Sequence, residues 1–171
     1  MVANKGAIHV VGTGTISEPL IGLLCSFKEQ AGFSEVTFHK RSPVTRDLPK
    51  IRALTSRGAL LTVDEHRISD FEALGLKPAM THEEALLKAD VVVDCTPSGV
   101  GISNKNEFYE KYLDNTKGFI AQGSEFGFGK MYARGINDVA LEAGKDRFIQ
   151  VVSCNTHNLC ALINTVALVD G

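Results

Sequence analysis

The feature that most constrains this chain is the alternation of short apolar segments with segments of helical pattern along its whole length. The apolar segments rarely alternate with polar residues, which is typical of parallel strands buried on both faces. Helices between such strands must cover the sheet from both sides. The sequence therefore predicts an α/β fold, a Rossmann-type doubly wound, mostly parallel sheet with helices on both faces. The expected strands are residues 7–11, 35–39, 60–63, 91–95, 118–121 and 148–152.

Helices are expected between and after these strands. Thr81 and Glu84 have the spacing of a capping box, in which the two side chains satisfy free N–H groups at a helix start. Pro49 is expected to disturb the second helix, and the glycine-rich residues 123–134 are expected to form a surface loop. The expected helices are residues 14–31, 43–57, 68–74, 82–89, 105–113, 134–143 and 154–169.

Size and charge exclude some classes of protein. The 171 residues suffice for one domain with a substantial core. A net charge of −2 provides no attraction to nucleic acid or to an anionic membrane, so neither is expected as a partner. No apolar run approaches the roughly 18–20 residues of a membrane span, and the first residues lack the apolar stretch of a signal peptide. The expected compartment is the cytoplasm.

The turn after the first expected strand has a dinucleotide-type glycine pattern. In such a turn Gly12 allows the tight bend, and Gly14 lets the backbone approach a pyrophosphate at the N-terminus of the next helix. The third glycine of the fingerprint is replaced by Ser17, a small residue that close helix packing can tolerate. Many strand-to-helix turns carry glycines without binding anything, but this context favours a nucleotide site.

The end of the second expected strand bears on the type of nucleotide. NAD-binding domains usually carry an acidic residue there, which binds the ribose hydroxyls. This chain instead has Lys40 and Arg41 between His39 and Ser42, with no carboxylate placed to repel a phosphate. These cations suit the 2′-phosphate of NADP, so NADP is favoured over NAD as the cofactor. A solvated basic loop is the simpler alternative.

Two further strand ends are candidates for the same site. Thr96 and Pro97 follow the fourth expected strand, and Gln122 and Gly123 follow the next one. Ligands of open α/β sheets bind outside the carboxyl ends of the strands, so both turns can line the nicotinamide-ribose site. From spacing alone, an ordinary turn at residues 96–99 is an equally good interpretation.

Cys154 lies between the last strand and the last helix, which Asn155 and Thr156 are expected to cap. A thiol at a helix N-terminus feels the positive end of the macrodipole, which favours the nucleophilic thiolate. A nucleotide site and a reactive thiol together suggest an oxidoreductase that works through a thioester. His157, one helical turn further on, is expected only to border the pocket.

The other cysteines and two histidines are expected to have no chemical role. Cys25 and Cys95 are expected to be buried, reduced thiols, and Cys160 to be packed on the last helix. No cysteine pair has a zinc-type spacing, so no metal site is predicted. His39 and His82 are expected on the surface.

These motifs occur together, and in the same order, in one family. They are Gly-x-Gly-Thr-Ile at residues 12–16, Asp-Cys-Thr-Pro at 94–97, Gln-Gly-x-Glu at 122–125 and Ser-Cys-Asn-Thr at 153–156. From about residue 7 to residue 165, the chain resembles the archaeal (type II) glyceraldehyde-3-phosphate dehydrogenases. The combination of Asp-Cys-Thr-Pro with Ser-Cys-Asn-Thr is specific.

The resemblance implies a role for each matched position. Cys154 is expected to attack an aldehyde, and the thioester left by hydride transfer to the nicotinamide is expected to be cleaved by phosphate. Ser153 and Asn155 are expected to flank the substrate. Contacts to the cofactor are implied for Thr15, Ile16 and Gly123. The implied partners are a nucleotide cofactor and, in the full-length protein, a small phosphorylated aldehyde. A homo-oligomer is a further expectation, since the family forms tetramers.

Family members are about twice as long, because a catalytic domain with the histidine base follows the cofactor domain. Residues 1–171 are therefore interpreted as an NAD(P)-binding Rossmann domain alone, divergent at Ser17 and at His157-Asn158. The isolated chain is expected to bind nucleotide but to catalyse poorly or not at all, because general acid–base help of roughly 10²–10⁴-fold is missing.

Two alternatives stay open. One is a related aspartate-semialdehyde or N-acetylglutamyl-phosphate reductase, which shares the nucleotide domain and the thioester cysteine. The Ser-Cys-Asn-Thr motif favours the glyceraldehyde-phosphate branch. The other is a stand-alone nucleotide-binding module that senses redox cofactor without catalysis. A Cys154 no more reactive than a free thiol would favour that module.

Overall fold

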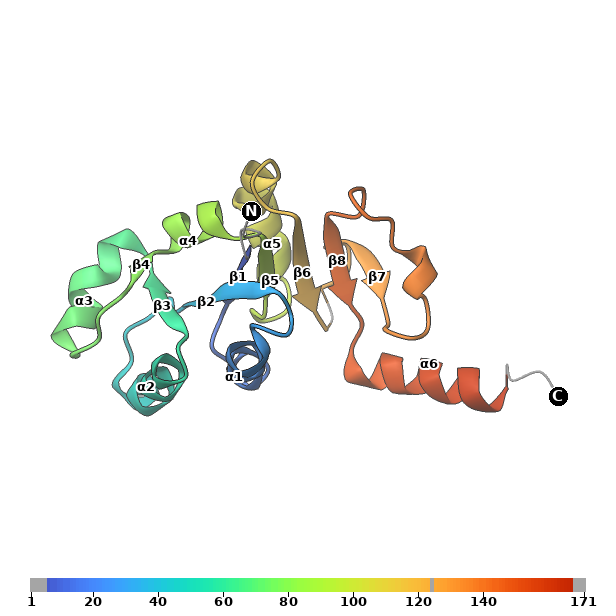
Figure 1. Ribbon diagram of the computed structural model, residues 1–171, viewed down its shortest axis with the longest axis horizontal. Coiled ribbons are helices and arrows are strands. Elements are labelled where there is room, and N and C mark those ends of the chain that lie inside the picture. Colours follow the sequence, from blue (N-terminus) through green and yellow to red (C-terminus); the bar gives the residue numbers. More distant parts are fainter. Residues whose placement is uncertain (1–5, 124, 168–171) are drawn as a thin grey trace.

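The fold is built on one eight-stranded sheet, seen in a computed structural model that describes residues 6–123 and 125–167. Every neighbouring pair of strands runs parallel, in the order β4-β3-β2-β1-β5-β6-β8-β7 (Figure 1). The predicted Rossmann-type α/β fold is confirmed. The strands are β1 (Gly6–Val11), β2 (Phe33–His39), β3 (Leu60–Val63), β4 (Met80–Thr81), β5 (Val91–Asp94), β6 (Gly118–Gln122), β7 (Lys130–Tyr132) and β8 (Phe148–Val151).

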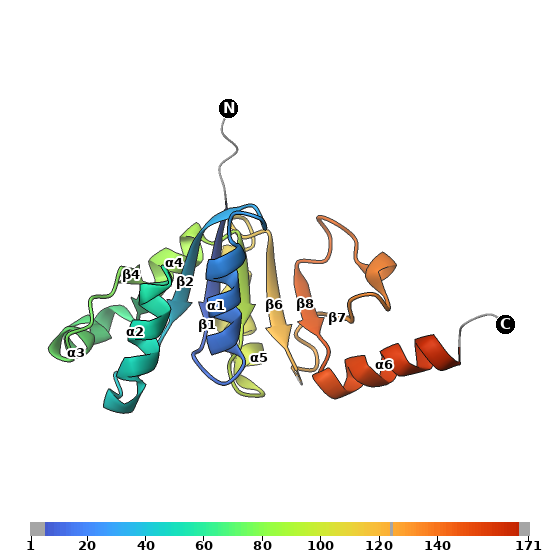
Figure 2. The ribbon, with the colours of Figure 1, turned by 60° about the horizontal axis from the view of Figure 1, so that its bottom comes forward.

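Helices cover both faces of the sheet, as Figures 1 and 2 show. On one face lie α1 (Ser17–Phe27) and α2 (Leu48–Ser56), and on the other lie α4 (His82–Lys88) and α5 (Val100–Glu107). The short α3 (Ile68–Ala73) lies near the β4 edge, and α6 (Cys154–Val166) projects beyond the other edge (Figure 2). None of the helices in these described residues is long and apolar enough to cross a bilayer. Short 3₁₀ turns lie at Thr45–Asp47, Glu65–Arg67, Tyr109–Tyr112 and Asp138–Ala140.

The chain changes direction across the sheet between β1 and β5. From β1 it moves outward through β2, β3 and β4, and it then returns to place β5 on the other side of β1. The pairing of Val11 with Asp94 brings the two strand ends together. A crevice at such a switch point is where open α/β sheets bind their ligands.

Gly12 is required where these strand ends meet. Its φ of +102° favours glycine, and a Cβ there would lie 3.1 Å from the carbonyl oxygen of Cys95. The backbone N–H of Cys95 donates to the carbonyl oxygen of Val11 at 2.9 Å. The glycine turn after β1 and the Thr96-Pro97 turn after β5 therefore lie side by side.

Two apolar cores hold the layers together. The first lies between the sheet and the α1/α2 side and contains Ile21, Phe38 and Ile51. The second lies on the α4/α5 side and is largely aromatic. The ring of Phe119 stacks between those of Tyr109 and Phe148, with centroid separations of 5.1 and 5.0 Å.

Two helix starts follow from local chemistry. The predicted capping box is confirmed, because Thr81 Oγ1 accepts from the Glu84 N–H at 3.1 Å and the Glu84 carboxylate accepts from the Thr81 N–H at 2.7 Å. The helix expected at residues 43–57 begins only at Leu48, after a 3₁₀ turn, and Pro49 does not interrupt it. Pro49 lies in the first turn of α2, where its missing N–H is not needed.

The predicted helix at 134–143 is wrong, because only a 3₁₀ turn forms at Asp138–Ala140. Side chains there bond the backbone in place of a helical ladder. Asn137 Oδ1 accepts from the Ala133 N–H at 2.8 Å, and Asp138 Oδ1 accepts from the Gly135 N–H at 3.1 Å. Gly135 also has a φ of +79°, which a right-handed helix cannot contain.

Other boundaries differ from the expectations. The helix expected at 105–113 begins earlier, at Val100, and ends at Glu107. The loop expected at 123–134 contains β7, which sequence reasoning missed along with the two-residue β4. The residue before β7 is Gly129, which approaches β8 closely. Any other residue there would place its Cβ against the carbonyl group of Phe148. The first helix ends at Phe27, and the last part of the helix expected to residue 169 lies outside the described residues.

Replacing Phe119 with alanine should destabilise the fold by about 3–5 kcal/mol, because it removes the central ring of the aromatic core. Urea unfolding monitored by circular dichroism measures the change. Phe126→Ala is the matched control, since that ring is 72% exposed and its loss should change stability by less than about 0.5 kcal/mol. Equal effects of the two substitutions would contradict the assigned core.

Candidate functional site

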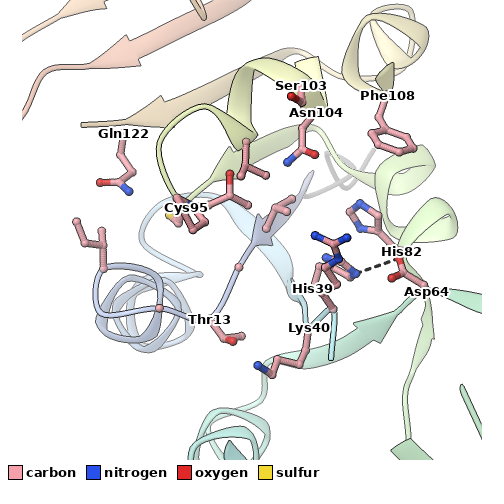
Figure 3. Close-up of a pocket in the computed structure, with 18 of the residues that line it drawn as sticks. Thr13, His39, Lys40, Asp64, His82, Cys95, Ser103, Asn104, Phe108 and Gln122 are labelled. Carbon is pink, nitrogen blue, oxygen red and sulfur yellow. Dashed lines mark hydrogen bonds and ion pairs between the residues drawn. The ribbon is translucent and has the colours of Figure 1, made fainter. Parts of the chain in front are cut away.

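A cavity of about 950 Å³ opens at the carboxyl ends of the central strands, beside the switch point (Figure 3). Its volume lies in the range of about 300–1,000 Å³ that is usual for ligand sites. Most of the residues predicted to bind the cofactor line it. They are Gly12, Gly14, Thr15, Ile16, Lys40, Arg41, Thr96 and Pro97.

Four predicted site residues do not line this cavity. They are Gly123 and the three residues around the thiol, Ser153, Cys154 and Asn155. Gln122, which does line it, pairs with Val151 of β8, and the Gly123 N–H donates to the Val151 carbonyl oxygen at 3.0 Å. The thiol segment therefore starts at the strand beside the cavity wall, without being part of that wall.

The glycine turn presents its backbone to the cavity. A Cβ on Gly14 would meet no heavy atom within 4 Å, so this backbone is open on the side away from the protein. Ser17, at the third position of the fingerprint, is fully buried and its hydroxyl donates to the Gly14 carbonyl oxygen at 3.3 Å. The serine thus fits the close packing that the fingerprint requires there.

Lys40 and Arg41 lie at the cavity in different states. Lys40 Nζ forms an ion pair with Asp47 Oδ2 at 2.6 Å, and the hydrogen bond from Lys40 lowers the pKa of the Asp47 carboxyl. The 3₁₀ turn after β2 thus brings a carboxylate, Asp47, next to the loop, where it is paired with Lys40. Arg41 is exposed and has no ion-pair partner among residues 6–123 and 125–167.

The Thr96-Pro97 turn is held by a buried carboxylate. Asp94, at the end of β5, accepts hydrogen bonds from the Thr96 N–H at 2.8 Å, from Asn104 Nδ2 at 2.8 Å and from the Tyr109 hydroxyl at 2.5 Å. Burial, followed by the charge of Asp94, raises the pKa of Tyr109 well above its usual value. The Tyr109 hydroxyl therefore keeps its proton and donates to Asp94, which in turn holds the Thr96 N–H of the turn.

Glu125 holds the same turn from the other side. Its carboxylate is 2% exposed and accepts from the backbone N–H groups of Gly99 at 2.6 Å and Ile102 at 3.1 Å. It therefore ties the segment after β6 to the start of α5, whereas Gln122 lines the cavity. The intervening Ser124 lies outside the described residues.

A cluster of three histidines forms the cavity wall below α4. His9 Nε2 lies 3.0 Å from His82 Nδ1, and the rings of His82 and His39 stack with centroids 4.0 Å apart. His39 Nε2 lies 3.2 Å from Asp64 Oδ1 (Figure 3, dashed line). His39, Asp64 and His82 line the cavity, while His9 is fully buried behind them. The expectation that His39 and His82 lie on the surface is wrong, because α4 folds over the sheet face that carries His9.

Burial sets the charge of this cluster. It lowers the pKa of His82 to about 3, helped by the nearby His39, and it lowers the pKa of His9 well below its usual value. The hydrogen bond from His39 lowers the pKa of Asp64. His9 and His82 are therefore neutral at neutral pH. No group of three metal-ligating side chains in the described part of the chain is arranged to hold a metal ion.

Cys154 is the first residue of α6 and is exposed. The cap is Ser153, whose hydroxyl accepts from the Thr156 N–H at 3.3 Å, so the expectation that Asn155 or Thr156 caps this helix is wrong. The reason is that Ser153 has extended backbone and Asn155 is already helical. His157 Nε2 lies 2.9 Å from the Arg134 carbonyl oxygen and does not line the cavity.

The other cysteines are less accessible. Cys95 is buried, and burial followed by the charge of Asp94 raises its pKa to about 12. Cys25 is half-buried instead of buried, and this burial raises its pKa. Both are therefore thiols at neutral pH, and Cys160 is half-buried on α6.

Sequence reasoning missed several lining residues, chiefly Asp64, His82 and Phe108. Asp64 could have been found, because it directly follows a correctly predicted strand and such positions face the crevice. His82 and Phe108 could not, since their positions depend on how α4 and α5 pack.

Comparison with known proteins agrees with this geometry. The chain is 35% identical over 164 residues to a glyceraldehyde-3-phosphate dehydrogenase of Methanobacterium bryantii. It is 33% identical over 161 residues to that of Methanobacterium formicicum, and 31% identical over 162 residues to glyceraldehyde-3-phosphate dehydrogenase 1 of Methanosarcina acetivorans. No family model matches. Over nearly its whole length the chain is similar to part of these archaeal glyceraldehyde-3-phosphate dehydrogenases.

The relationship to these dehydrogenases covers 94–95% of this chain but only 45% of each relative. The chain therefore spans just under half the length of the curated relatives it matches. The resemblance found from the motifs is confirmed for this part of the dehydrogenase sequence.

The free energy of unfolding should fall as the pH is lowered from 7 to 5. His9 and His82 take up protons near pH 6.5 when unfolded, but their folded pKa values lie lower, so acid favours the unfolded state. The expected loss is about 1–2 kcal/mol for each histidine. Urea unfolding at both pH values measures it. His82→Asn should remove one histidine's share of the slope, whereas the exposed His66 can be replaced without effect. An unchanged slope in His82→Asn would contradict the assigned burial.

Proposed function

We propose that this chain binds a nicotinamide dinucleotide in the cavity at the β1/β5 switch point, as the cofactor-binding part of a glyceraldehyde-3-phosphate dehydrogenase-like oxidoreductase. The observation that carries the proposal is convergence. Eight residues chosen from three separate sequence motifs line one cavity, and they include both glycines of the turn after β1. The names of the related proteins support the same activity.

The residues present fit such a cofactor. The open backbone at Gly14 and the start of α1 suit a pyrophosphate, because helix N-termini attract anions. Thr96, Pro97 and Gln122 line the side of the cavity toward β5 and β6, where a nicotinamide-ribose would lie. When bound, the nicotinamide ring would accept the hydride that the substrate loses.

NADP is the favoured form. Arg41, at the end of β2, has no ion-pair partner in the described part of the chain, whereas the neighbouring Lys40 is paired with Asp47. A guanidinium binds phosphate oxygens in a fork, which favours a 2′-phosphate. NAD would lack that contact.

Cys154 would supply the nucleophile. Its sulfur would form a bond to the aldehyde carbon, and phosphate would later cleave the thioester and release the thiolate. Ser153 and Asn155, on either side of it, would position the substrate. The thiol is exposed and follows the strand next to the cavity wall, which is consistent with this role.

The chain matches only 45% of its relative from Methanobacterium bryantii. We propose that catalysis also needs a protein segment that corresponds to the unmatched part. Four large apolar side chains of α6 are more than half exposed, namely Leu159, Leu162, Ile163 and Val166. A second domain or a further subunit would cover such a face. A homo-oligomer acting in the cytoplasm on a small phosphorylated aldehyde remains part of the proposal.

A second candidate is a nucleotide-binding redox sensor without catalysis. The observation that favours it is that Cys154 does not line the cavity. A semialdehyde or acyl-phosphate reductase would use the same cavity and thiol, and substrate choice separates it from the first proposal.

Calorimetric titration should give binding of both nucleotides, tighter for NADP. Arg41→Gln should weaken NADP binding about tenfold and NAD binding less than twofold, because only the 2′-phosphate loses a charged contact. Arg46→Gln is the matched control, since Arg46 is exposed in the same loop but does not line the cavity. If neither NADP nor NAD binds, the proposed function is contradicted.

Alkylation by iodoacetamide at pH 7 should modify Cys154 first and faster than it modifies a free thiol such as N-acetylcysteine. Cys154 is exposed at the start of α6, whereas Cys95 is buried. Mass spectrometry of digested protein identifies the modified residue, and Cys154→Ser is the control. A Cys154 that reacts no faster than the free thiol would support the sensor.

A further inference from the structure

The histidine cluster has a feature that nucleotide binding in general does not explain. The buried stripe of β1, β2 and β3 below α4 carries His9, Thr37 and His39 where apolar residues would pack. His82 reaches this stripe from α4. The cluster lies directly before the two cations at residues 40 and 41, along the same cavity wall.

One assignment of the protons satisfies both hydrogen bonds of Thr37 and both of His9, and we adopt it. The Thr37 hydroxyl donates to the Ile8 carbonyl oxygen at 3.4 Å, so its oxygen accepts from His9 Nδ1–H at 2.7 Å. His9 Nε2 then has only a lone pair, and it must accept from His82 Nδ1–H at 3.0 Å. This leaves His82 Nε2 as an unprotonated nitrogen with no hydrogen-bond partner among the described residues.

This nitrogen can accept a proton without disturbing its neighbours. Protonation at Nε2 leaves the Nδ1–H of His82 bonded to His9 and changes no other hydrogen bond of the relay. His39 is less suitable, because its Nε2 is already engaged by Asp64 at 3.2 Å. Nε2 of His82 is therefore a nitrogen that can take a proton without breaking a hydrogen bond of the cluster.

We infer that His82, positioned by His9, takes up a proton when the 2′-phosphate of NADP binds and then donates a hydrogen bond to that phosphate. This inference rests on the proposed function. The proton comes from solvent and bonds to Nε2, and no covalent bond to the nucleotide forms or breaks. His82 thereby becomes a specificity-determining residue, since NAD offers no charge to stabilise the imidazolium.

The surrounding charges are consistent with this linkage. Burial and His39 keep the His82 ring neutral without ligand, while Asp64 acts in the opposite direction. A phosphate dianion would add two negative charges beside a ring in contact with His39, which directly precedes Lys40 and Arg41. The charged or titratable groups that face His82 or share its cavity are His9, His39, Lys40, Arg41, Asp64, His66 and Glu107.

The test counts protons. Titration calorimetry at pH 6.0 with NADP, in two buffers of different ionisation enthalpy, gives the number of protons taken up on binding. A phosphate with its second pKa near 6 should by itself release protons when cations bind its dianion. Wild-type protein should instead show net uptake of up to about half a proton with NADP, because His82 gains up to one proton while the phosphate loses about half of one, and it should show none with NAD.

Variants assign the proton to its residue. His82→Asn keeps a polar side chain that cannot be protonated, and it should reverse the sign to proton release and weaken NADP binding about tenfold, with NAD changed less than threefold. His9→Gln should reduce the uptake through its effect on His82. His157→Asn is the control, because His157 does not line the cavity, and it should keep the wild-type uptake.

Each result decides between outcomes. Proton release by wild-type protein, or uptake that persists in His82→Asn, overturns the inference while leaving nucleotide binding intact. Binding of neither nucleotide overturns the proposed function, and the inference with it. If His82→Asn does not fold, the sign measured for wild-type protein still decides whether the inference fails.

Discussion

The parallel pairing of β1 with β5 is the contact on which the rest of the structure depends. It fixes Val11 opposite Asp94, and this register brings the glycine turn and the Thr96-Pro97 turn to one point. Gly12 is needed because the carbonyl group of Cys95 leaves no room for a side chain. The cavity is thus a direct result of strand pairing at the switch point.

Buried polar groups secure the loops around this point. Asp94 and Glu125 each accept backbone N–H groups of the segment that connects β5 with α5. Buried carboxylates require such partners, since an unpaired one would be strongly destabilising. Loops fixed in this way can present a preformed surface to a ligand, which lowers the entropic cost of binding.

The histidine cluster finds most of its hydrogen-bond partners within the chain, whereas α6 does not bury its apolar side chains. Both ring nitrogens of His9 and one nitrogen each of His39 and His82 are hydrogen-bonded, and His39 and His82 line the cavity. α6 has no fully buried residue among those described, although its sequence is amphipathic. The histidine cluster is consistent with a bound ligand. The exposed apolar face of α6 is consistent with contact to another protein segment, such as one corresponding to the unmatched part of the relatives.

Local sequence predicted those elements whose determinants are close along the chain. The continuous apolar strands, the capping box at Thr81 and the glycine turn were all correct, because each depends on residues within a few positions. The helix at 134–143 failed because Asn137 and Asp138 bond the backbone nearby, a competition that periodicity does not reveal. β7 was missed because its pairing with β8 requires a close approach at Gly129.

By itself, the sequence determined the α/β class, the relationship to archaeal glyceraldehyde-3-phosphate dehydrogenases and the set of strand-end residues that could form a site. Those properties follow from the pattern of apolar residues and from short motifs, both of which depend on residues close together in the sequence. Only the tertiary structure decided that His9, His39 and His82 meet, although 30 and 43 positions separate them along the chain. The reason is that sheet register and the packing of α4, not local sequence, bring distant side chains within hydrogen-bonding distance.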